Sequence, residues 1–257
     1  MPINFTQIFQ DSWNFMRNQQ KITLQFSAFF FVVAFAVNLL ASNLLPANIM
    51  PDEAGSNAAD LEVVGNLMLS KDIVVLGVVQ VLLNLFISCW GIMTFHQLSE
   101  RRRLPLGQTL NMTAKRFAGV FFINLIIVFP LVIGLAESLV ALIGKNAPSL
   151  FSVFTITLGI FIFIRLNLAT VHYLITQTGL AQTLKVIWLS GFKRTGVLFI
   201  YCLLIYFALP LIVRNIAALS DNMLFDIVIS FIISAINVFS LIFSYRFYTL
   251  FMQKAQA

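Results

Sequence analysis

The stretch FAGVFFINLIIVFPLVIGLAESLVALI, residues 117–143, runs for 27 residues with Glu137 as its single charged side chain. A helix that rises about 1.5 Å per residue needs roughly 20 apolar residues to cross a hydrocarbon core about 30 Å thick. Backbone polar groups have no water partner in lipid, so a spanning segment is either a helix or a strand of a closed barrel. Because the stretch lacks the alternation of a barrel strand, it predicts a transmembrane helix.

The rest of the chain repeats this pattern. Of its 257 residues, 60% are hydrophobic and 10% are charged, whereas a soluble domain carries about 25% charged residues. The sequence therefore predicts an all-α membrane protein with six transmembrane helices in a single domain, residues 1–257. The first apolar run is too long for a cleaved signal, so we expect it to be a retained span. The six predicted spans are Ile22–Leu45, Ile73–Phe95, Phe117–Ile143, Leu150–Ile175, Gly196–Val213 and Leu224–Tyr245.

The distribution of Lys and Arg between the connecting segments predicts the orientation, because short cytoplasmic loops are enriched in both residues. One side carries most of the cations: Arg17, Lys21, Arg101, Arg102, Arg103, Lys115, Arg116, Lys185, Lys193, Arg194, Arg246 and Lys254. The other side carries Lys71, Lys145 and Arg214, and its 46–72 loop is acidic. We therefore expect both termini to be cytoplasmic. The net charge of +6 follows from this topology, so nucleic-acid binding is not predicted.

Three cytoplasmic segments share a pattern of apolar residues at helical spacing followed by basic residues. They begin Gln7-Ile8-Phe9, Gln108-Thr109-Leu110 and Gln182-Thr183-Leu184. Such segments are typical of helices lying in the membrane interface, and we expect Trp13 and Trp188 to act as their interfacial anchors. Pro130 and Pro210 recur at matching places in the third and fifth spans. The sequence thus predicts three units, each an interfacial helix plus a two-helix hairpin.

The ends of the chain carry a family resemblance. Asp11-Ser12-Trp13-Asn14-Phe15-Met16-Arg17-Asn18-Gln19 and Tyr245-Arg246-Phe247-Tyr248-Thr249-Leu250 resemble the YciC-like family of uncharacterised Gram-negative inner-membrane proteins. Length and span number match as well. The resemblance implies a multi-pass protein of the bacterial cell inner membrane, and it implies no activity.

A second, local resemblance covers residues 159–194. The segments Gly159-Ile160…Arg165-Leu166-Asn167-Leu168-Ala169 and Thr183-Leu184…Trp188-Leu189-Ser190…Lys193-Arg194 are similar to the membrane module beside some glycerophosphodiester phosphodiesterases. That module usually has Pro where this chain has Leu158, and acidic residues where it has Gln177-Thr178. The chain contains no phosphodiesterase catalytic domain, so the resemblance implies a connection with lipid but no enzyme activity.

Arg165 is the one basic residue inside a predicted span, and ionisable groups there are candidates for function. It lies about 22 Å from the outer end of its span, close enough to the cytoplasmic surface for its side chain to reach the headgroups. Snorkelling or plain packing is one interpretation. The other is a polar pocket that binds a lipid phosphate through the planar guanidinium. Its lining would be Arg165, Asn84, Asn124 and Asn237, although amides at this depth also commonly join helices.

The sequence offers few groups for other chemistry. Cys89 and Cys202 lie within spans, and His96 and His172 lie near span ends with no carboxylate close by, so we predict no metal site, no cofactor and no catalytic residues. The basic cytoplasmic face follows from topology, and such clusters also attract anionic lipid. Its residues are Arg101, Arg102, Arg103, Lys115, Arg116, Lys193 and Arg194.

Two functions remain open. The first is a non-enzymatic protein that organises the envelope or handles lipid, with membrane lipids, including anionic ones, as its partners. The second is a small-solute transporter or permease, because the two prolines could break spans. Ion-coupled transporters usually carry acidic residues at mid-membrane, and the predicted spans have none there. The sequence does not identify a ligand, a protein partner or an oligomeric state.

Overall fold

The structure is a computed structural model of the chain and describes residues 3–44, 70–102, 104–144, 146–192, 194–218 and 223–256. Six helical runs in these residues are long and apolar enough to cross a membrane, and the described residues contain no strand. The all-α class and the six spans are therefore confirmed. The runs are α2 (Gln20–Leu44), α4 (Lys71–Ser99), α5 (Leu106–Ile143), α6 with α7 (Leu150–Leu166 and Ala169–Ile175), α9 with η2 and α10 (Thr195–Cys202, Leu203–Ala208 and Leu209–Ala217), and α11 (Met223–Gln256).

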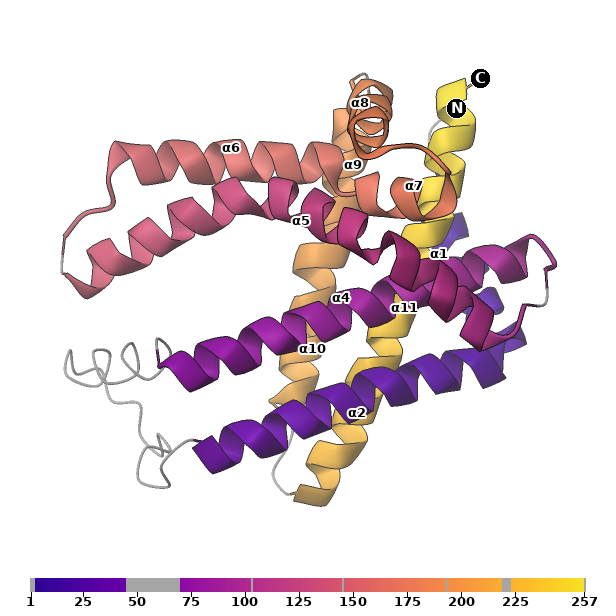
Figure 1. The fold of residues 1–257 in the computed structure, drawn as a ribbon, viewed down its shortest axis with the longest axis horizontal. Coiled ribbons are helices and arrows are strands. Elements are labelled where there is room, and N and C mark those ends of the chain that lie inside the picture. The colour runs from indigo at the N-terminus through magenta and orange to yellow at the C-terminus, as the bar shows by residue number, and fades with distance from the viewer. Residues whose placement is uncertain are drawn as a thin grey trace.

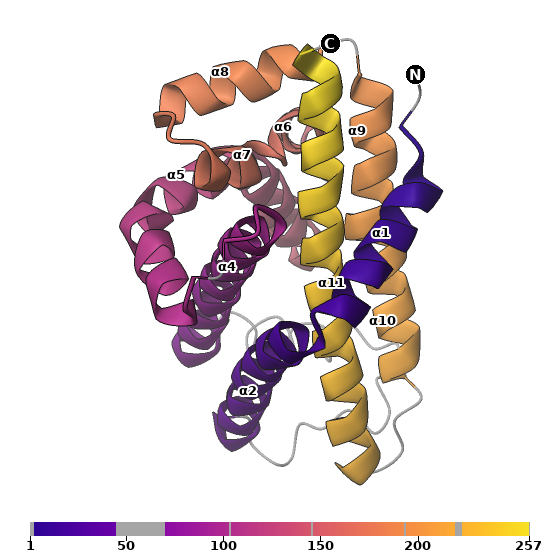
Figure 2. The same cartoon turned by 90° about the vertical axis from the view of Figure 1, so that its right-hand side faces the viewer.

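These helices form two crossed sets (Figure 1). The helices α2, α4, α5 and α6 run in one general direction, and α9–α10 and α11 run across them. The short helix α8 (Leu180–Ser190) and the C-terminal end of α11 lie together at the top of Figure 2, and the N-terminal helix α1 (Phe5–Asn18) crosses α11 below them. The marked N- and C-terminal ends lie near each other in both views.

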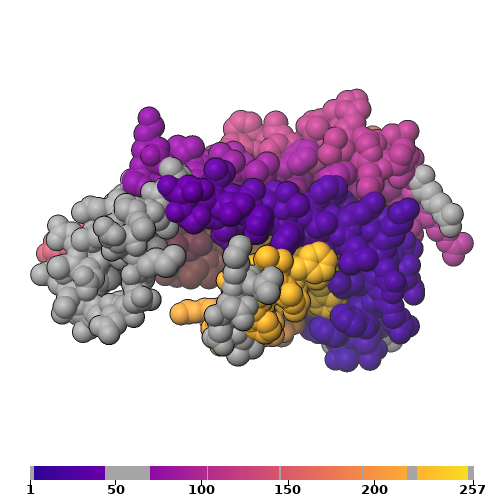
Figure 3. All heavy atoms as spheres, turned by 90° about the horizontal axis from the view of Figure 1, so that it is seen from below, coloured from indigo at the N-terminus to yellow at the C-terminus, as the bar shows by residue number. Residues whose placement is uncertain are grey.

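The outer surface of the spans is strongly apolar. Leu150 is 89% exposed, Val140 67% and Val81 66%. Seen from below, α2 forms a band next to the first part of α11, with which it packs (Figure 3). A surface with this many large exposed apolar side chains is suited to lipid. In lipid, packing and interhelical hydrogen bonds rather than the hydrophobic effect hold the helices together.

The C-terminal half of α11 lies at the centre of that packing. Phe247 is fully buried and stacks on Tyr201 of α9, with ring centroids 4.3 Å apart. It also stacks on Phe5 of α1, with ring centroids 5.7 Å apart. Aromatic pairs of this kind contribute about 0.5–1.5 kcal/mol each beyond the area they bury. One side chain thus joins α1, α9 and α11.

Helix α5 is longer than a single bilayer crossing. Its 38 residues would extend about 57 Å if straight, nearly twice the hydrocarbon thickness, and Figures 1 and 2 show it curved. Pro130 lies inside it, and the following turn approaches α6 so closely that a Cβ at Gly159 would be 2.7 Å from the backbone nitrogen of Leu131. Only glycine permits this contact.

The predicted grouping into three units remains a prediction. The helices α1 and α8 are separate short elements, but the segment expected to be the second interfacial helix is continuous with α5. Two spans are also interrupted. Asn167 and Leu168 separate α6 from α7, and the π-helical segment η2 separates α9 from α10.

Candidate functional site

The two terminal motifs meet in space. Residues 11–19 form the second half of α1 and the link to α2, and residues 245–250 lie in α11. Helix α1 crosses α11, with the Phe9 ring edge-on to Phe239 at 5.1 Å. Further along, the guanidinium carbon of Arg246 lies 5.1 Å from the centre of the Phe15 ring. The motifs that carry the family resemblance thus build one junction.

A polar crevice of about 620 Å³ opens at this junction. It lies between α1, the C-terminal end of α4 and α11, and we call it the terminal-motif crevice. All of its lining residues except Phe15 and Leu98 are polar. The complete lining consists of Asp11, Asn14, Phe15, Asn18, Gln19, Leu98, Ser99, Arg101 and Arg246.

Charges of both signs line the crevice without neutralising one another. No ion pair within 4.0 Å joins Asp11 to Arg101 or Arg246, and all three residues are described. The Nε atom of Arg246 is buried and has no hydrogen-bond partner, while the Phe15 and Tyr245 rings lie 5.1 and 5.9 Å from its guanidinium carbon. A guanidinium held in this way retains unused N–H donors for an anionic group.

Arg101 occupies an unusual backbone conformation. Its φ of 58° is positive, and its N–H bonds the carbonyl of Leu98 at 3.0 Å while the N–H of Arg102 bonds that of Gln97 at 2.9 Å. This pair of bonds is the Schellman motif that ends a helix, and its left-handed position is normally glycine. A residue with a Cβ there costs about 1–2 kcal/mol. An arginine at this position is a reason to look for a role of its side chain.

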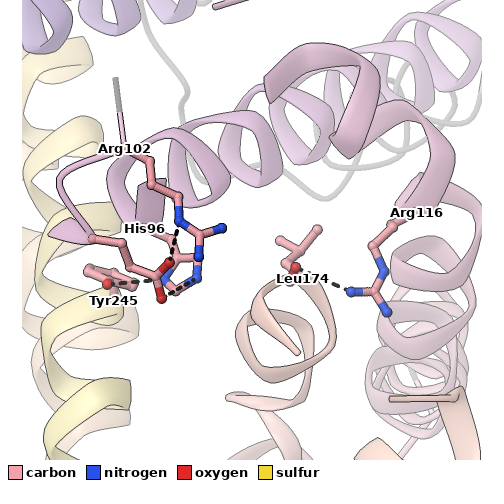
Figure 4. A network of polar contacts seen from close by, with 6 residues as sticks. His96, Arg102, Arg116, Leu174 and Tyr245 are labelled. Carbon is pink, nitrogen blue, oxygen red and sulfur yellow. Dashed lines mark hydrogen bonds and ion pairs between the residues drawn. The ribbon is translucent and has the colours of Figure 1, made fainter. Parts of the chain in front are cut away.

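Two histidine–tyrosine contacts fix α11 against its neighbours. His96 Nδ1 lies 3.2 Å from the Tyr245 hydroxyl, and its Nε2 lies 3.4 Å from Glu100, which also pairs with Arg102 (Figure 4). His172 Nδ1 lies 2.8 Å from the Tyr248 hydroxyl, and both of these side chains are buried. The expectation that no carboxylate lies close to either histidine is wrong for His96, which has Glu100 beside it, and His172 is part of the packed core. Tyr245 and Tyr248 are three residues apart and so lie on one helix face. This spacing was the sequence feature that could have indicated that both contact neighbouring helices.

Arg165 is enclosed by protein, with 3% of its surface exposed. Its Nη2 donates to the carbonyl of Trp188 at 2.6 Å and its Nη1 to the hydroxyl of Thr195 at 3.0 Å. The guanidinium carbon lies 4.9 Å from the Trp188 ring centre. Because Trp188 is in the last turn of α8, the cation meets the negative end of the helix dipole. These contacts are those expected if Arg165 has a packing role, rather than if it binds a lipid phosphate.

The structure does not bring the predicted amide pocket together. Asn124 donates to the Thr170 hydroxyl at 3.0 Å, which joins α5 to α7. Asn84 is half-buried on α4, and Asn237 is exposed on α11. No hydrogen bond links any of these amides to Arg165 within the described part of the chain. A shared phosphate pocket of these four residues remains a prediction that no contact supports.

Two arginines of the predicted basic face donate hydrogen bonds to backbone carbonyls at or near helix ends. Arg116 donates to the carbonyl of Leu174 in the last turn of α7 (Figure 4) and to the carbonyls of Thr176 and Thr178, which follow that helix. Arg194 donates to the carbonyl of Phe251 at 3.2 Å, near the end of α11. Lys115, Arg101 and Arg102 are exposed. Arg103 and Lys193 lie outside the described residues.

The predicted anchors Trp13 and Trp188 lie on the short helices α1 and α8 and are 54% and 37% exposed. Trp13 lines an apolar hollow of about 270 Å³ on the face of α1 opposite the terminal-motif crevice. Its lining is Trp13, Met16, Arg17, Gln20, Thr23 and Leu24. A tryptophan beside a cation and apolar side chains suits the membrane interface, which keeps the anchor role open for both residues.

The fold and its apolar surface define a multi-pass helical membrane protein. The chain is 43% identical to an uncharacterised protein of Haemophilus influenzae over 253 residues, which cover 98% of this chain and 100% of the relative. It belongs to the same family as that protein. No family model matches the sequence, and no solved structure matches the chain. The YciC-like assignment therefore remains a resemblance. Within the described residues, no group of three or more His, Cys, Asp or Glu side chains could hold a metal ion.

Proposed function

We propose that this is a non-enzymatic protein of the bacterial inner membrane, with both termini cytoplasmic, that binds membrane phospholipid and so helps to organise the envelope. The observation that carries the proposal is the terminal-motif crevice. It is polar, it holds two arginines, and it lies where the apolar helix α4 ends at Ser99. The end of an apolar span is the level of lipid headgroups, and arginine is the side chain best suited to bind phosphate.

The position of α1 supports the same proposal. Its exposed face carries Phe9 and Trp13, as an in-plane interfacial helix would. Its other face lines the crevice. A lipid headgroup in the crevice would therefore contact α1, α4 and α11 at once and would stabilise their junction by binding the folded arrangement.

The test is lipid retention. The full chain is extracted into polymer nanodiscs without detergent, and the bound phospholipid is quantified by native mass spectrometry. Arg246→Ala should lose protein-bound phospholipid, whereas Arg102→Ala should not, because Arg102 is 67% exposed and does not line the crevice. Equal retention in both variants and in the parent would contradict the proposal.

A second candidate, a small-solute permease, is favoured by the interrupted spans. The break between α6 and α7 contacts the end of α9 through Asn167, whose amide donates to the Sγ of Cys202, the residue just before the π-helical segment. Discontinuous spans line the sites of many transporters, and π segments often occur at functional sites. Solute flux into proteoliposomes that Asn167→Ala abolishes, with lipid retention unchanged, would favour this function over the first.

A further inference from the structure

The terminal-motif crevice has an electrostatic pattern that is more specific than a basic patch. Arg101 and Arg246 provide two cations, and Asp11 provides one carboxylate, in a single crevice of about 620 Å³. A site that evolved only to attract anions would gain from losing the carboxylate, because a like charge near the ligand repels it. The arrangement is complementary to a ligand that itself carries both signs.

The arginines suit a phosphodiester. Arg246 lines the crevice, its Nε is buried without a hydrogen-bond partner, and its guanidinium carbon lies 5.1 Å from the centre of the Phe15 ring. Arg101 is placed at the crevice by a backbone conformation that glycine would adopt at lower cost. Two guanidinium groups can together provide the paired N–H donors that phosphate oxygens accept.

Asp11 suits a primary ammonium. A carboxylate accepts hydrogen bonds and donates none, and an ammonium group has three N–H donors to give. A quaternary ammonium has no N–H and cannot make this bond. The amides of Asn14, Asn18 and Gln19 line the same crevice and can bond the remaining headgroup oxygens. The chemistry therefore separates an amine-bearing headgroup both from a purely anionic one and from a choline headgroup.

We propose that the terminal-motif crevice binds the headgroup of a phospholipid that carries both a phosphodiester and a primary amine. Arg101 and Arg246 bind the phosphate, and Asp11 binds the ammonium. This inference rests on the proposed function and names its ligand. The acyl chains remain in the bilayer, because the crevice lies where the apolar helix α4 ends.

The experiment uses the full chain in nanodiscs that contain equal amounts of phosphatidylethanolamine, phosphatidylglycerol and phosphatidylcholine, with retained lipid measured by native mass spectrometry. The parent protein should retain the ethanolamine lipid preferentially. Asp11→Asn should reduce that preference over the glycerol lipid about tenfold, the worth of a charge-assisted hydrogen bond. Asp72→Asn is the matched control, because Asp72 lies in the first turn of α4, at its other end.

The outcomes separate this inference from the broader proposal. If the parent retains the three lipids equally, or if Asp11→Asn retains the parent's preference, the amine-specific site is wrong while phospholipid binding stands. If Arg246→Ala retains as much phospholipid as the parent, both fail. Glycerophosphoethanolamine and inorganic phosphate are added as competitors, and either of them displacing the lipid at equal concentration would overturn the membrane as the source of the ligand. Melting temperatures of all variants must match the parent's within a few degrees, and Asp11→Glu should restore the preference if Asp11→Asn unfolds the junction.

Discussion

Arg246 and Phe15 come from opposite ends of the chain, and the guanidinium carbon of the first lies 5.1 Å from the ring centre of the second. This contact places an arginine of α11 beside α1 and leaves its buried Nε without a partner. A cation over an aromatic ring contributes about 0.5–2 kcal/mol. Phe15→Leu should therefore keep the apolar packing but weaken lipid retention at the crevice, measured in the same nanodiscs. Phe154→Leu, at a 64% exposed position on α6 away from the junction, is the control and should retain lipid.

Arg101 has a positive φ, which costs folding free energy, and we propose that its side chain binds lipid phosphate. Arg101→Gly removes the cost of a left-handed non-glycine residue, so thermal unfolding should show a gain of about 1 kcal/mol. The same variant should lose bound phospholipid, because it removes one of the two crevice cations. Arg102→Gly removes an equal charge from the same segment and should leave lipid retention unchanged. A loss of stability in Arg101→Gly would mean that the side chain, and not a ligand, maintains this turn.

The two histidine–tyrosine contacts should contribute different amounts to the free energy of unfolding. Tyr248→Phe removes the hydroxyl that lies 2.8 Å from the buried His172, and an unsatisfied buried polar group costs about 1–3 kcal/mol. Tyr245→Phe should cost less, because His96 keeps Glu100 at 3.4 Å. Unfolding of both variants in one detergent gives the comparison. A larger loss of stability in Tyr245→Phe than in Tyr248→Phe would contradict this prediction.

Arg165 should behave as a structural residue. A lysine is a point charge and cannot reproduce a fork that reaches both the Trp188 carbonyl and the Thr195 hydroxyl. Arg165→Lys should therefore lower the free energy of unfolding by about 1–3 kcal/mol and leave lipid retention at the terminal-motif crevice unchanged. Arg214→Lys, at an exposed position on α10, should do neither. If Arg165→Lys instead lost bound anionic lipid at unchanged stability, the phosphate role first considered for Arg165 would be restored.

Topology is testable independently of lipid. We expect reporter fusions after Phe95 and Ala257 to be active in the cytoplasm and a fusion after Leu45 to be active in the periplasm, as the distribution of cations predicts. The fusions are compared at equal expression in one host. Periplasmic activity at Ala257 would refute the six-span orientation with cytoplasmic termini.

The spans could be predicted from sequence because hydropathy is a local property. The stretch 117–143 is apolar over a length that only a membrane helix uses, and α5 contains it. The interruption at Asn167 and the π-helical segment from Leu203 were not predicted, because each falls inside a segment that hydropathy treats as one continuous span, 150–175 and 196–213. Hydropathy therefore predicts the number of spans but not the breaks within them.

The site depends on contacts between distant segments, and such contacts leave little trace in a single sequence. The depth of Arg165 in its span indicates a special role, but the sequence does not show that its partners lie on α8 and α9. The terminal motifs drew attention as a resemblance, and only the crossing of α1 over α11 brings Asp11 and Arg246 to one crevice. The positive φ of Arg101 also has no sequence signal, because glycine is the residue that would have indicated it.

The most direct test of the central claim is photo-crosslinking with a phosphatidylethanolamine analogue that carries its reactive group next to the amine. The full chain in nanodiscs is irradiated, and the labelled peptides are mapped by mass spectrometry, with unlabelled phosphatidylethanolamine or phosphatidylglycerol as competitors. Labelling should concentrate on residues 11–19 and on the α11 peptide around Arg246, and the ethanolamine lipid should compete better than the glycerol lipid. Labels confined to the lipid-facing surfaces of α5 and α6, with neither terminal motif modified, would contradict a headgroup site in the terminal-motif crevice.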